Sequence, residues 1–416
     1  MKPAVIHYTA PPVVGGVEAV IQAHAQVFAE AGYPLTVIAG DGDERALPPG
    51  TDFIHIPEMN SQHPAISRAN AELDKGQIPS NFDDLAALLE EKLAPLLERQ
   101  DNVIVHNILT KHFNLPLTAA LFRLFDTGVI HHGIAWCHDF SWTSPNSRSK
   151  VFPKYPWDLL RTYRPEMTYV AVSEARKIEL AGLLGCPVER IHTIYNGVDP
   201  KILLGLSDQG WDLIERLGIL SDDLVLLMPV RVTQAKNIEF ALQVAAALKA
   251  RQVRPKLILT GPPDPHDQQS MDYFHELQAL RSQLQVEEEM RFVFESSLSS
   301  GQTLTIDSRV VGDLFRVSDV LFMPSHREGF GMPVLEAGLA GIQVISTDVP
   351  AAEEIGGEDV IRFSLTDSPD HIADLILSWA DCSPAHRMRR RVRQQYTWQA
   401  IFQREIKPML QAGAPS

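Results

Sequence analysis

Short apolar runs alternate with helical repeats along the first half of the chain. The runs have the length of buried strands and lie at residues 4–9, 35–39, 53–56, 103–106, 134–137, 169–172 and 191–194. Leucines at helical spacing fill residues 82–99, whereas residues 58–80 show no clear period and are expected to form a loop or short helices. Strands that alternate with helices are typical of a parallel sheet covered on both faces.

The second half of the chain repeats this alternation. Its apolar runs lie at residues 224–230, 257–260, 291–294, 319–325, 343–346 and 360–363. Helical patterns separate several of them, at residues 238–248, 273–284 and 311–317, and the chain is helical again from about residue 369. The pattern of the whole chain therefore predicts an α/β protein.

The length and composition indicate two globular domains. The chain has 416 residues, too many for one compact core, so two domains of roughly 200 residues each are expected. Hydrophobic residues make up 45% and charged residues 21%, as in ordinary globular proteins. No apolar run approaches the roughly 18 residues that span a bilayer, and residues 1–8 have the pattern of a first strand rather than of a signal peptide.

Cysteine content and net charge limit the cellular compartment and the classes of partner that are expected. Cys137, Cys186 and Cys382 are odd in number and widely spaced, which favours neither a disulfide framework nor a metal cluster. A cytoplasmic location is therefore expected. The formal net charge of -15 argues against general nucleic-acid binding and against tight docking on an anionic membrane, because both need basic faces.

The stretch from Glu328 to Glu336 carries the strongest chemical signal. It follows an apolar run and leads, through Gly329 and Gly331, into the start of a small-residue helix. A strand, a glycine turn and a helix aim backbone N–H groups and the helix dipole at an anion. Carboxylates at both ends suit hydroxyl groups, so the pattern predicts a nucleotide-sugar. The alternative is an ordinary turn with two solvated acids.

Three further motifs lie beside predicted strands. Arg231 and Lys236 are five residues apart in a loop after a buried strand, where they could grip one diphosphate unless they belong to a solvated loop. His138 and Asp139 follow another strand, at the edge where α/β sheets bind ligands, although a buried His–Asp pair is the alternative. The pair Gly15-Gly16 follows the first strand but lacks the spacing of a nicotinamide dehydrogenase motif, and a simple tight turn would also explain it.

Together these motifs resemble the retaining glycosyltransferases of family 4, whose signature is Glu-(seven residues)-Glu. The resemblance implies that Glu328 faces the donor sugar, that Glu336 holds the ribose, and that Arg231 and Lys236 stabilise the departing diphosphate. It also implies that His138 lies beside the donor sugar. His138, Arg231, Lys236 and Glu328 are thus the candidate catalytic residues. The family's usual glycine before the arginine is replaced here by Val230.

Further donor and acceptor contacts follow from the same resemblance. The candidate donor-binding residues besides the catalytic ones are Gly15, Gly16, Gly261, Phe294, Gly329, Phe330, Gly331, Met332, Val334, Leu335 and Glu336. Asp139 and Trp142 are candidates for contacting the acceptor.

The family architecture is GT-B, in which two Rossmann-like domains face a central cleft. The resemblance implies an acceptor-binding domain over residues 1–197, joined by a terminal helix of about residues 380–416 that crosses back, and a nucleotide-sugar-binding domain over residues 198–379. The turn Asn196-Gly197-Val198-Asp199 is expected to be the hinge, since Asn-Gly favours tight turns.

The implied reaction moves a hexosyl group, with retention, from a nucleoside-diphosphate sugar to a hydroxyl of a small or saccharide acceptor. UDP-glucose is the first expectation for the donor and GDP-mannose the second, on commonness alone. No Asp-x-Asp motif stands in the right place, so no metal and no cofactor are expected. A homo-oligomer is left open. The alternatives are a nucleotide-sugar epimerase or hydrolase on the same fold and a non-catalytic nucleotide-sugar sensor.

Overall fold

The chain divides into two compact units. The computed structural model describes residues 2–264, 268–296 and 306–412. One unit comprises Met1–Val198 and Trp398–Ser416, and the other comprises Asp199–Thr397. The division at residue 198 falls within the Asn-Gly-Val-Asp turn. The chain returns to the first unit only at Trp398, later than the position near residue 380 expected from the sequence, because helix α14 (Pro384–Gln395) belongs to the second unit.

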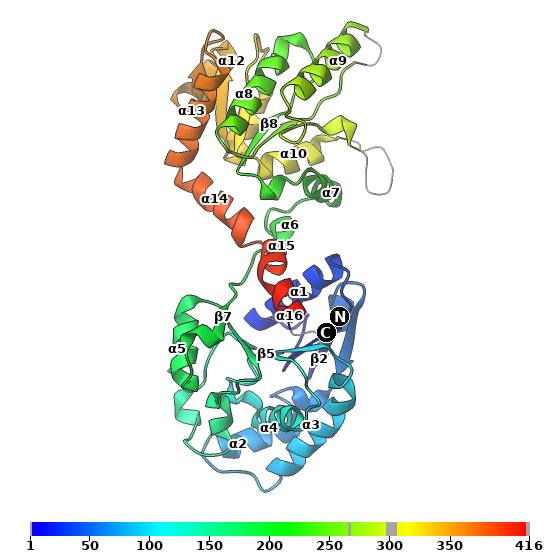
Figure 1. Cartoon of the computed structure of the whole chain (residues 1–416), viewed down its shortest axis with the longest axis vertical. Helices are drawn as coiled ribbons and strands as arrows, with labels where there is room; N and C mark the ends of the chain where they lie inside the picture. Colours follow the sequence, from blue (N-terminus) through cyan, green and yellow to red (C-terminus); the bar gives the residue numbers. More distant parts are fainter. Residues whose placement is uncertain (1, 265–267, 297–305, 413–416) are drawn as a thin grey trace. The chain divides into compact units, whose positions relative to one another are not determined.

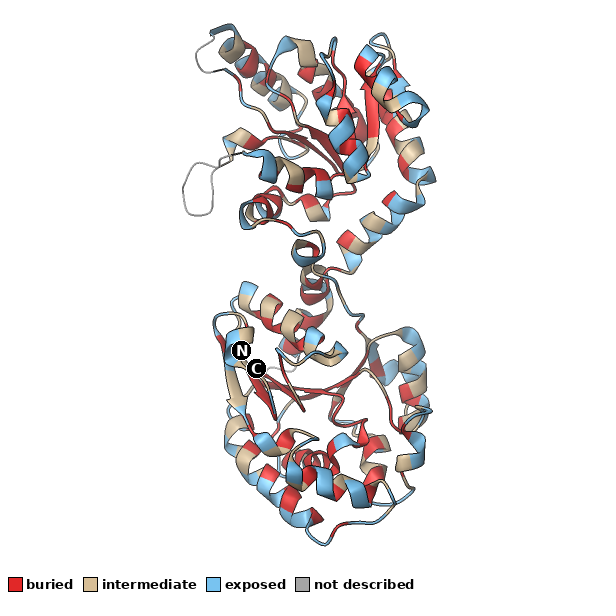
Figure 2. Cartoon of the chain, turned by 180° about the vertical axis from the view of Figure 1, so that it is seen from behind, coloured by how far each residue is buried: buried red, intermediate tan, exposed pale blue. Residues whose placement is uncertain are grey.

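The described residues of the first unit form a seven-stranded parallel sheet with the order β3-β2-β1-β4-β5-β6-β7 (Figure 1). The strands are β1 (Pro3–His7), β2 (Leu35–Ala39), β3 (Thr51–His55), β4 (Asn102–His106), β5 (Gly133–Cys137), β6 (Thr168–Ala171) and β7 (Ile191–Thr193). In the central register, Ala4 of β1 lies opposite Thr36 of β2 and Val103 of β4. Several strands are wholly buried (Figure 2), which explains why they read as continuous apolar runs.

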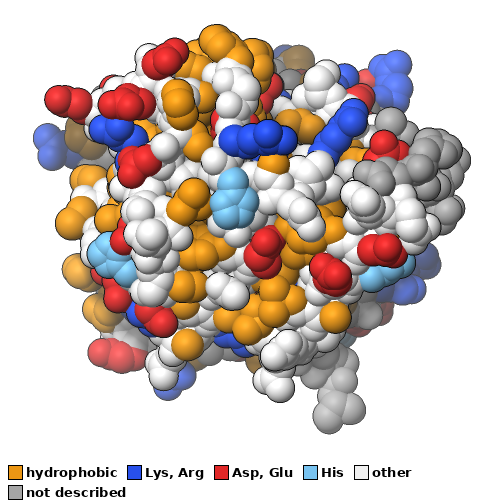
Figure 3. Space-filling model, turned by 90° about the horizontal axis from the view of Figure 1, so that it is seen from above, with side chains coloured by type: hydrophobic (Ala, Val, Ile, Leu, Met, Phe, Trp, Pro, Cys, Tyr) orange, Lys and Arg blue, Asp and Glu red, His pale blue; other side chains and the backbone are white. Residues whose placement is uncertain are grey.

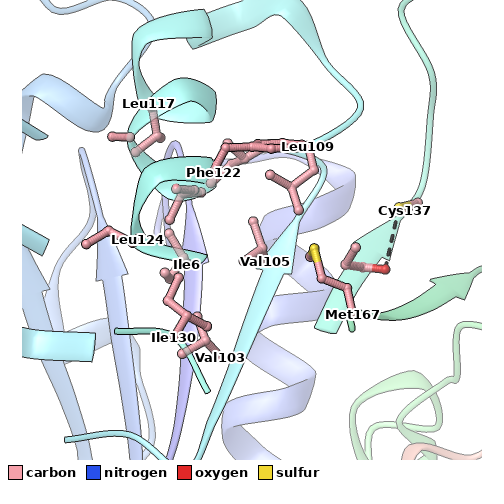
Figure 4. Packing of buried hydrophobic residues seen from close by; sticks show 14 of the residues in the cluster. Ile6, Val103, Val105, Leu109, Leu117, Phe122, Leu124, Ile130, Cys137 and Met167 are labelled. Carbon is pink, nitrogen blue, oxygen red and sulfur yellow. Dashed lines mark hydrogen bonds between the residues drawn. The ribbon is translucent and has the colours of Figure 1, made fainter. Parts of the chain in front are cut away.

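Helices cover both faces of this sheet. They are α1 (Gly16–Glu30), α2 (Pro64–Leu73), α3 (Phe82–Leu97), α4 (Leu115–Asp126), α5 (Glu174–Leu184), α15 (Trp398–Ile401) and α16 (Lys407–Ala412), with a π-helical stretch at Phe402–Ile406. Short 3₁₀ turns lie at Glu44–Ala46, Pro57–Met59, His112–Asn114, Arg148–Lys150, Trp157–Arg161 and Val188–Arg190. Helix α1 and the C-terminal helices share one apolar cluster with the sheet, and α3, α4 and α5 share the other. Figure 4 shows part of the second cluster, where Leu117 and Phe122 of α4 lie near Ile6 and Val105 of the strands.

The described residues of the second unit form a six-stranded parallel sheet with the order β10-β9-β8-β11-β12-β13. Its strands are β8 (Leu224–Met228), β9 (Pro255–Leu259), β10 (Met290–Phe292), β11 (Val320–Met323), β12 (Gln343–Thr347) and β13 (Ile361–Phe363). Its helices besides α14 are α6 (Pro200–Leu203), α7 (Asp208–Leu217), α8 (Ile238–Ala250), α9 (Gln268–Gln283), α10 (Ser308–Val317), α11 (Met332–Ala340), α12 (Pro350–Gly356) and α13 (Pro369–Cys382). Short 3₁₀ turns lie at Ile219–Ser221, Gln234–Lys236, Val293–Glu295 and Gly357–Asp359.

Each unit is thus a Rossmann-like, doubly wound domain, as the sequence predicts. In such sheets the strand order reverses at one point, and ligands bind outside the carboxyl ends of the strands there. The reversal lies between β1 and β4 in the first unit and between β8 and β11 in the second. The loops that follow these four strands are therefore the places to look for a site.

Helix α14 is fastened to the second unit by arginines. Arg393 donates to both carboxylate oxygens of Asp319, at 3.1 and 2.8 Å, and Arg390 lies 2.6 Å from the carboxylate of Asp223. Arg389 donates to the backbone carbonyl of Ser318 at 2.7 Å. The side chains of Arg393 and Asp319 are only 6% and 1% exposed, so this ion pair is a buried connection between α14 and the rest of the second unit.

Two general properties of the described chain concern the charge of its surface and the hydrophobicity of its helices. On the face seen in Figure 3, acidic, basic and hydrophobic side chains are intermingled, and no single charge dominates it. Within the described ranges, no helix is both long and apolar enough to cross a membrane.

Candidate active site

In the second unit, the loops after β8 and β11 come together at the reversal point. The backbone N–H of His326 donates to the carbonyl of Ala235 at 2.9 Å, which ties one loop to the other. The hydroxyl of Thr347, at the end of β12, donates to the carbonyl of Ser325 at 2.6 Å and fixes the first residues after β11. These bonds hold Lys236 and Glu328 close to each other although they are 92 residues apart in sequence.

Lys236 and Glu328 form a close ion pair. The Lys236 Nζ lies 2.8 Å from Glu328 Oε1 and 2.7 Å from Oε2. The hydroxyl of Ser325 donates to the same Oε1 at 2.6 Å. The Glu328 side chain is 7% exposed and that of Lys236 is 21% exposed. Two of the four candidate catalytic residues therefore meet in a largely desolvated pair, and Ser325, which the sequence analysis did not single out, orients it.

The glycine turn leads directly into helix α11. Gly331 is buried and has a φ of 81°, and a Cβ there would lie 2.8 Å from the Cβ of Ala351. Only glycine adopts this conformation without strain. Pro333 occupies the first helical turn, where no N–H donor is lost. Val334 is buried in the core of the unit, so its contribution to a ligand site is limited to its backbone.

The other candidate residues of this stretch face solvent. Phe330 is 63% exposed, Met332 55% and Leu335 45%, and Gly329 and Glu336 are exposed as well. The backbone N–H groups at the start of α11 are among those that an α-helix leaves without intrahelical acceptors. The stretch from Glu328 to Glu336 therefore presents two carboxylates and a helix N-terminus at one loop.

Arg231 lines a cavity of the second unit whose lining does not include Lys236 or Glu328. This cavity, of about 570 Å³, is lined by Arg231, Val232, Thr233, Gln234, Pro262, Pro263, Asp264, Gln269, Ser270 and Tyr273. Gly261, just before it, donates its N–H to the carbonyl of Val230 at 3.0 Å. A Cβ on Gly261 would lie 2.5 Å from that oxygen, so glycine is needed for the close approach of the two loops. Arg231 itself is exposed.

Phe294 lies in an aromatic cluster. Its ring centroid is 5.2 Å from that of Phe274 and 5.6 Å from that of Phe292. The side chain is half-buried in the 3₁₀ turn after β10, and the structure assigns it a packing role within the second unit.

In the first unit, three histidines follow the carboxyl ends of neighbouring strands. His7 ends β1, His106 ends β4 and His138 follows β5. The Nδ1 of His7 lies 2.9 Å from the carbonyl of His106, and because a carbonyl only accepts, this nitrogen carries the proton. The Nδ1 of His106 and the Nε2 of His138 are hydrogen-bonded at 3.1 Å. His24 of α1 packs against this group, 5.3 Å from the ring of His106.

These histidines are held uncharged near neutral pH. Burial lowers the pKa of His138 to about 4 and that of His24 to about 3. Burial also lowers the pKa of His7 and, well below its usual value, that of His106. An apolar environment disfavours the charged imidazolium, which is the physical cause of all four shifts. His138 is therefore suited to neutral hydrogen bonding rather than to accepting a proton at pH 7.

The loop after β4 positions His138 and Asp139. Asn107 has a φ of 57°, and its side-chain oxygen accepts from the backbone N–H groups of His138 and Asp139, at 2.8 and 3.2 Å. The Asp139 carboxylate lies 2.8 Å from the Lys111 Nζ and 3.7 Å from Arg176. Burial alone would raise the pKa of Asp139, but the hydrogen bond from Lys111 and the two positive charges lower it.

Glu18 completes this group from the first turn of α1. Its carboxylate accepts from the hydroxyl of Thr9 and lies 3.8 Å from the Nε2 of His7. A Cβ on Gly15 would collide with the Glu18 carboxylate, so Gly15 is the residue that lets this side chain fold back towards β1. His7, His106 and Asn107 are functional candidates that the sequence pattern alone does not reveal.

These groups surround a cavity of about 600 Å³, the β1 pocket. It is lined by His7, Tyr8, Thr9, Val13, Gly16, Val17, Glu18, Asp41, Asn60, Ser61, Gln62, Asn107, Phe113, His138, Asp139 and Asn196. The size is that of a small-molecule site. Three candidate residues, Gly16, His138 and Asp139, thus meet in one pocket. The position of each polar residue just after a strand of a parallel sheet is the signal that could have identified the rest.

Trp142 does not line the β1 pocket. Its indole N–H donates to the carbonyl of Trp157 at 3.2 Å, and the guanidinium of Arg161 lies 4.1 Å from the ring centroid. Both its polar group and its ring face are therefore occupied by the protein. Within the described residues, no group of three or more His, Cys, Asp or Glu side chains is arranged to hold a metal ion.

Comparison with known proteins places each unit in a family. Residues 14–202 match the family model described as Glycosyltransferase Family 4, and residues 210–396 match the model described as Glycosyl transferases group 1. The two matches follow one another along the chain and correspond closely to the two structural units.

Individual relatives agree with the family matches. The chain is 26% identical over 257 residues to an uncharacterized glycosyltransferase of Methanocaldococcus jannaschii, covering 60% of this chain and 61% of the relative. It is 24% identical over 269 residues to a mannosylglucosylglycerate synthase of Petrotoga mobilis, covering 60% of each. A D-inositol 3-phosphate glycosyltransferase of Jonesia denitrificans is 27% identical over 185 residues, covering 43% of this chain and 40% of the relative. The chain thus spans about three-fifths of the length of the first two relatives.

Solved structures are similar over the full length but at low identity. Sucrose-phosphate synthase from Thermosynechococcus elongatus is 16% identical with a TM-score of 0.40, covering 99% of this chain and 98% of that one. Anabaena HepE, solved in complex with UDP, is 18% identical with a TM-score of 0.36, covering 99% and 100%.

Proposed function

We propose that this chain, whose two Rossmann-like domains match the models of Glycosyltransferase Family 4 and Glycosyl transferases group 1, moves a hexosyl group from a nucleoside-diphosphate sugar to a hydroxyl of a small or saccharide acceptor. The observation that carries this proposal is the Lys236–Glu328 pair at the reversal point of the second sheet. A cation for the diphosphate and a carboxylate for sugar hydroxyls meet there from two loops, and the carboxylate lies on the loop that leads into α11.

In this proposal, positively charged side chains bind the diphosphate of the donor, and hydrogen bonds bind its sugar and ribose. Lys236 and Arg231 stabilise the departing diphosphate, and the N–H groups of the turn at Gly329 and Gly331 and of the start of α11 receive sugar and phosphate oxygens. Glu328 accepts from hydroxyls of the sugar, and Glu336 accepts from those of the ribose. Loss of either cation is expected to raise the barrier by about 2–4 kcal/mol, by analogy with single donors to a developing negative charge.

In this proposal, the transferred sugar retains its configuration at the anomeric carbon. The acceptor attacks from the face that the diphosphate leaves, and a leaving-phosphate oxygen takes the proton of the acceptor hydroxyl. The new glycosidic C–O bond forms as the sugar–phosphate C–O bond breaks, and the electron pair departs with the diphosphate. This scheme needs no metal and no cofactor, because Arg231 and Lys236 supply the positive charge.

The first unit supplies the acceptor side. The β1 pocket holds neutral His138, whose Nε2 is already bonded to His106; its remaining ring nitrogen is the atom that contacts a sugar hydroxyl. Two of the relatives are named for small hydroxylated molecules that also carry an anionic group, D-inositol 3-phosphate and mannosylglucosylglycerate, which supports the small size and the hydroxyls of the acceptor here but not its charge. UDP-glucose is the first donor to test and GDP-mannose the second.

A thermal-shift experiment tests the donor half of the proposal. UDP, GDP and ADP are each added with EDTA present, to the wild type and to Glu336→Ala, with Glu276→Ala as the matched control on the exposed surface of α9. Binding of one diphosphate raises the melting temperature by mass action. We expect a shift with one base in the wild type and the control, and a smaller one in Glu336→Ala. Absence of a shift with every base would contradict the assigned donor site.

A further inference from the structure

The wall of the β1 pocket is acidic. Three carboxylates line it, those of Glu18, Asp41 and Asp139, and among the described residues that line the pocket none is Lys or Arg. Each carboxylate carries a formal negative charge near pH 7. The pocket therefore differs in sign from the loop of Lys236 and Arg231 in the second unit, where a diphosphate is expected.

The cations nearest to the pocket are already engaged. Lys111 lies 2.8 Å from Asp139, with 7% of its side chain exposed and its ammonium 4.9 Å from the ring centroid of Phe113. Arg176 lies 2.6 Å from Glu179 and 3.7 Å from Asp139. These two cations compensate Asp139, whereas neither Glu18 nor Asp41 forms an ion pair with a lysine or arginine among the residues that the structure describes. His7 beside Glu18 adds no positive charge, because burial lowers its pKa.

Nε2 of His7 faces Oε1 of Glu18, which already accepts from the hydroxyl of Thr9. His7 is 5% exposed, and its Nδ1 proton goes to the carbonyl of His106. The neutral ring therefore presents a lone pair at Nε2, which lies 3.8 Å from Oε1 of Glu18, another acceptor. Neither atom can donate to the other. A hydroxyl group placed beside them would donate to one of the two, whereas a phosphate or carboxylate would meet only lone pairs and negative charge.

The rest of the polar wall is uncharged. It consists of the hydroxyls and amides of Thr9, Asn60, Ser61, Gln62, Asn107 and Asn196. Such groups bind hydroxyls in either direction and have no charge to offer an anion. We propose that the β1 pocket, beside the donor-binding Gly16 and His138, takes a hydroxyl-rich acceptor that carries neither phosphate nor carboxylate, and that Glu18 and Asp41 select against anionic acceptors. This inference rests on the proposed transferase function.

The test measures transfer to matched pairs of acceptors. The donor is the sugar nucleotide with the base that the thermal-shift experiment identifies, with glucose and then mannose as its sugar. The pairs are glucose with glucose 6-phosphate, glucose with glucuronate, mannose with mannose 6-phosphate, and inositol with inositol phosphate. Initial rates of product formation are followed by mass spectrometry. We expect the uncharged member to react at least tenfold faster in each pair that gives product.

Two results would overturn the inference while leaving the proposed function standing. One is an equal or faster rate with the phosphorylated or carboxylated member. The other is no product from any uncharged acceptor in a protein that still binds its nucleoside diphosphate through Glu336. If no diphosphate binds at all, the proposed function fails, and the inference about the acceptor falls with it.

A charge-reversal variant identifies the residue responsible. Asp41 is exposed at the pocket, and Asp52 is exposed on β3 outside it. Asp41→Lys should reduce the preference for the uncharged acceptor at least fivefold, and Asp52→Lys, with the same change in net charge, should leave it unchanged. Asp41→Asn keeps the acceptor for the N–H of Gly42, which binds Asp41 at 2.8 Å, and should lie between the two. An equal effect of both lysine variants would mean that overall charge, not the pocket, sets the preference.

Discussion

Lys236 and Glu328 bind each other through both carboxylate oxygens, at 2.8 and 2.7 Å. Each is assigned to a different part of the donor, Lys236 to the diphosphate and Glu328 to the sugar. In the structure they form an ion pair and neutralise each other. Donor binding must therefore share or displace this contact, and the two residues should respond to mutation in opposite ways.

Glu328→Gln should retain or strengthen nucleoside-diphosphate binding, because Lys236 loses its competing carboxylate. Turnover should nevertheless fall, because the sugar loses its acceptor. Lys236→Met should weaken diphosphate binding and lower kcat by about 10²–10³-fold, as expected for one lost donor to developing charge. Calorimetric titration with the diphosphate and steady-state kinetics measure the two effects. Unchanged diphosphate affinity in Lys236→Met would remove Lys236 from the diphosphate site.

Gly331, at the start of helix α11, and Gly338, inside it, should differ sharply in how substitution by alanine changes the stability of the second unit. Gly331→Ala forces a residue with a side chain into a φ of 81° and places its Cβ 2.8 Å from Ala351, so it should destabilise the second unit by about 1–3 kcal/mol. Gly338 lies inside α11 with nothing within 4 Å of the Cβ position. Gly338→Ala should therefore be neutral or stabilise by up to about 1 kcal/mol. Thermal unfolding of the two variants against the wild type measures this difference.

Acid should destabilise the first unit through its buried histidines. The folded-state pKa is lowered to about 4 for His138 and to about 3 for His24, against about 6.5 in the unfolded chain. Between these values the unfolded state binds more protons, so stability is present above pH 6.5 and is lost as the pH falls towards 4. Each such histidine adds a slope of about 1.4 kcal/mol per pH unit in this window.

His24 provides the cleanest test of this pH dependence. Neither of its ring nitrogens has a hydrogen-bond partner among the described residues, and the side chain is fully buried. His24→Phe should therefore reduce the slope of stability against pH between 6.5 and 4 without a large loss at pH 7. The exposed His192 is the control, and His192→Gln should leave the slope as it is. Urea unfolding at several pH values would contradict the assignment if the two variants behaved alike.

The buried pair of Arg393 and Asp319 should be essential to the second unit. Arg393→Met leaves a carboxylate that is 1% exposed without its partner, and removal of one member of a buried pair typically costs about 3–5 kcal/mol. Arg391→Met, on the exposed side of the same helix, should change little. Adding Asp319→Asn to Arg393→Met should recover part of the loss. Denaturant unfolding of the single and double variants provides the measurement, and additive losses would argue against direct coupling.

The strands could be predicted from the sequence because parallel strands covered on both faces are continuously apolar. Helix α4 shows why some other elements could not be predicted from the sequence. Nine of its twelve residues are buried, so it lacks the polar stripe that marks an amphipathic helix. Residues 58–80 contain α2, which agrees with the expectation of short helices there. The chain crosses back at Trp398 and not near residue 380, because the arginines of α14 bind the second unit, which helical periodicity cannot reveal.

The candidate site was predictable only where its residues are close in sequence. The turn from Glu328 to Glu336 carries its own signal in its glycines and acids. The contact of Lys236 with Glu328 joins loops 92 residues apart and depends on strand order. The histidines at 7, 106 and 138 become neighbours only because β1, β4 and β5 are adjacent in the sheet. Single polar residues after strands are weak signals until that order is known.

The first unit is completed by the last part of the chain. Phe402 packs on Phe28, with ring centroids 5.3 Å apart, and the carbonyl of Leu410 accepts from Asn102. During synthesis, residues 1–198 emerge before these partners exist, and the face that receives Trp398 and Phe402 stays uncovered while the second unit is made. The second unit, in contrast, is one continuous segment and can close as soon as it is released. The domain that leaves the ribosome first is therefore the one that finishes folding last.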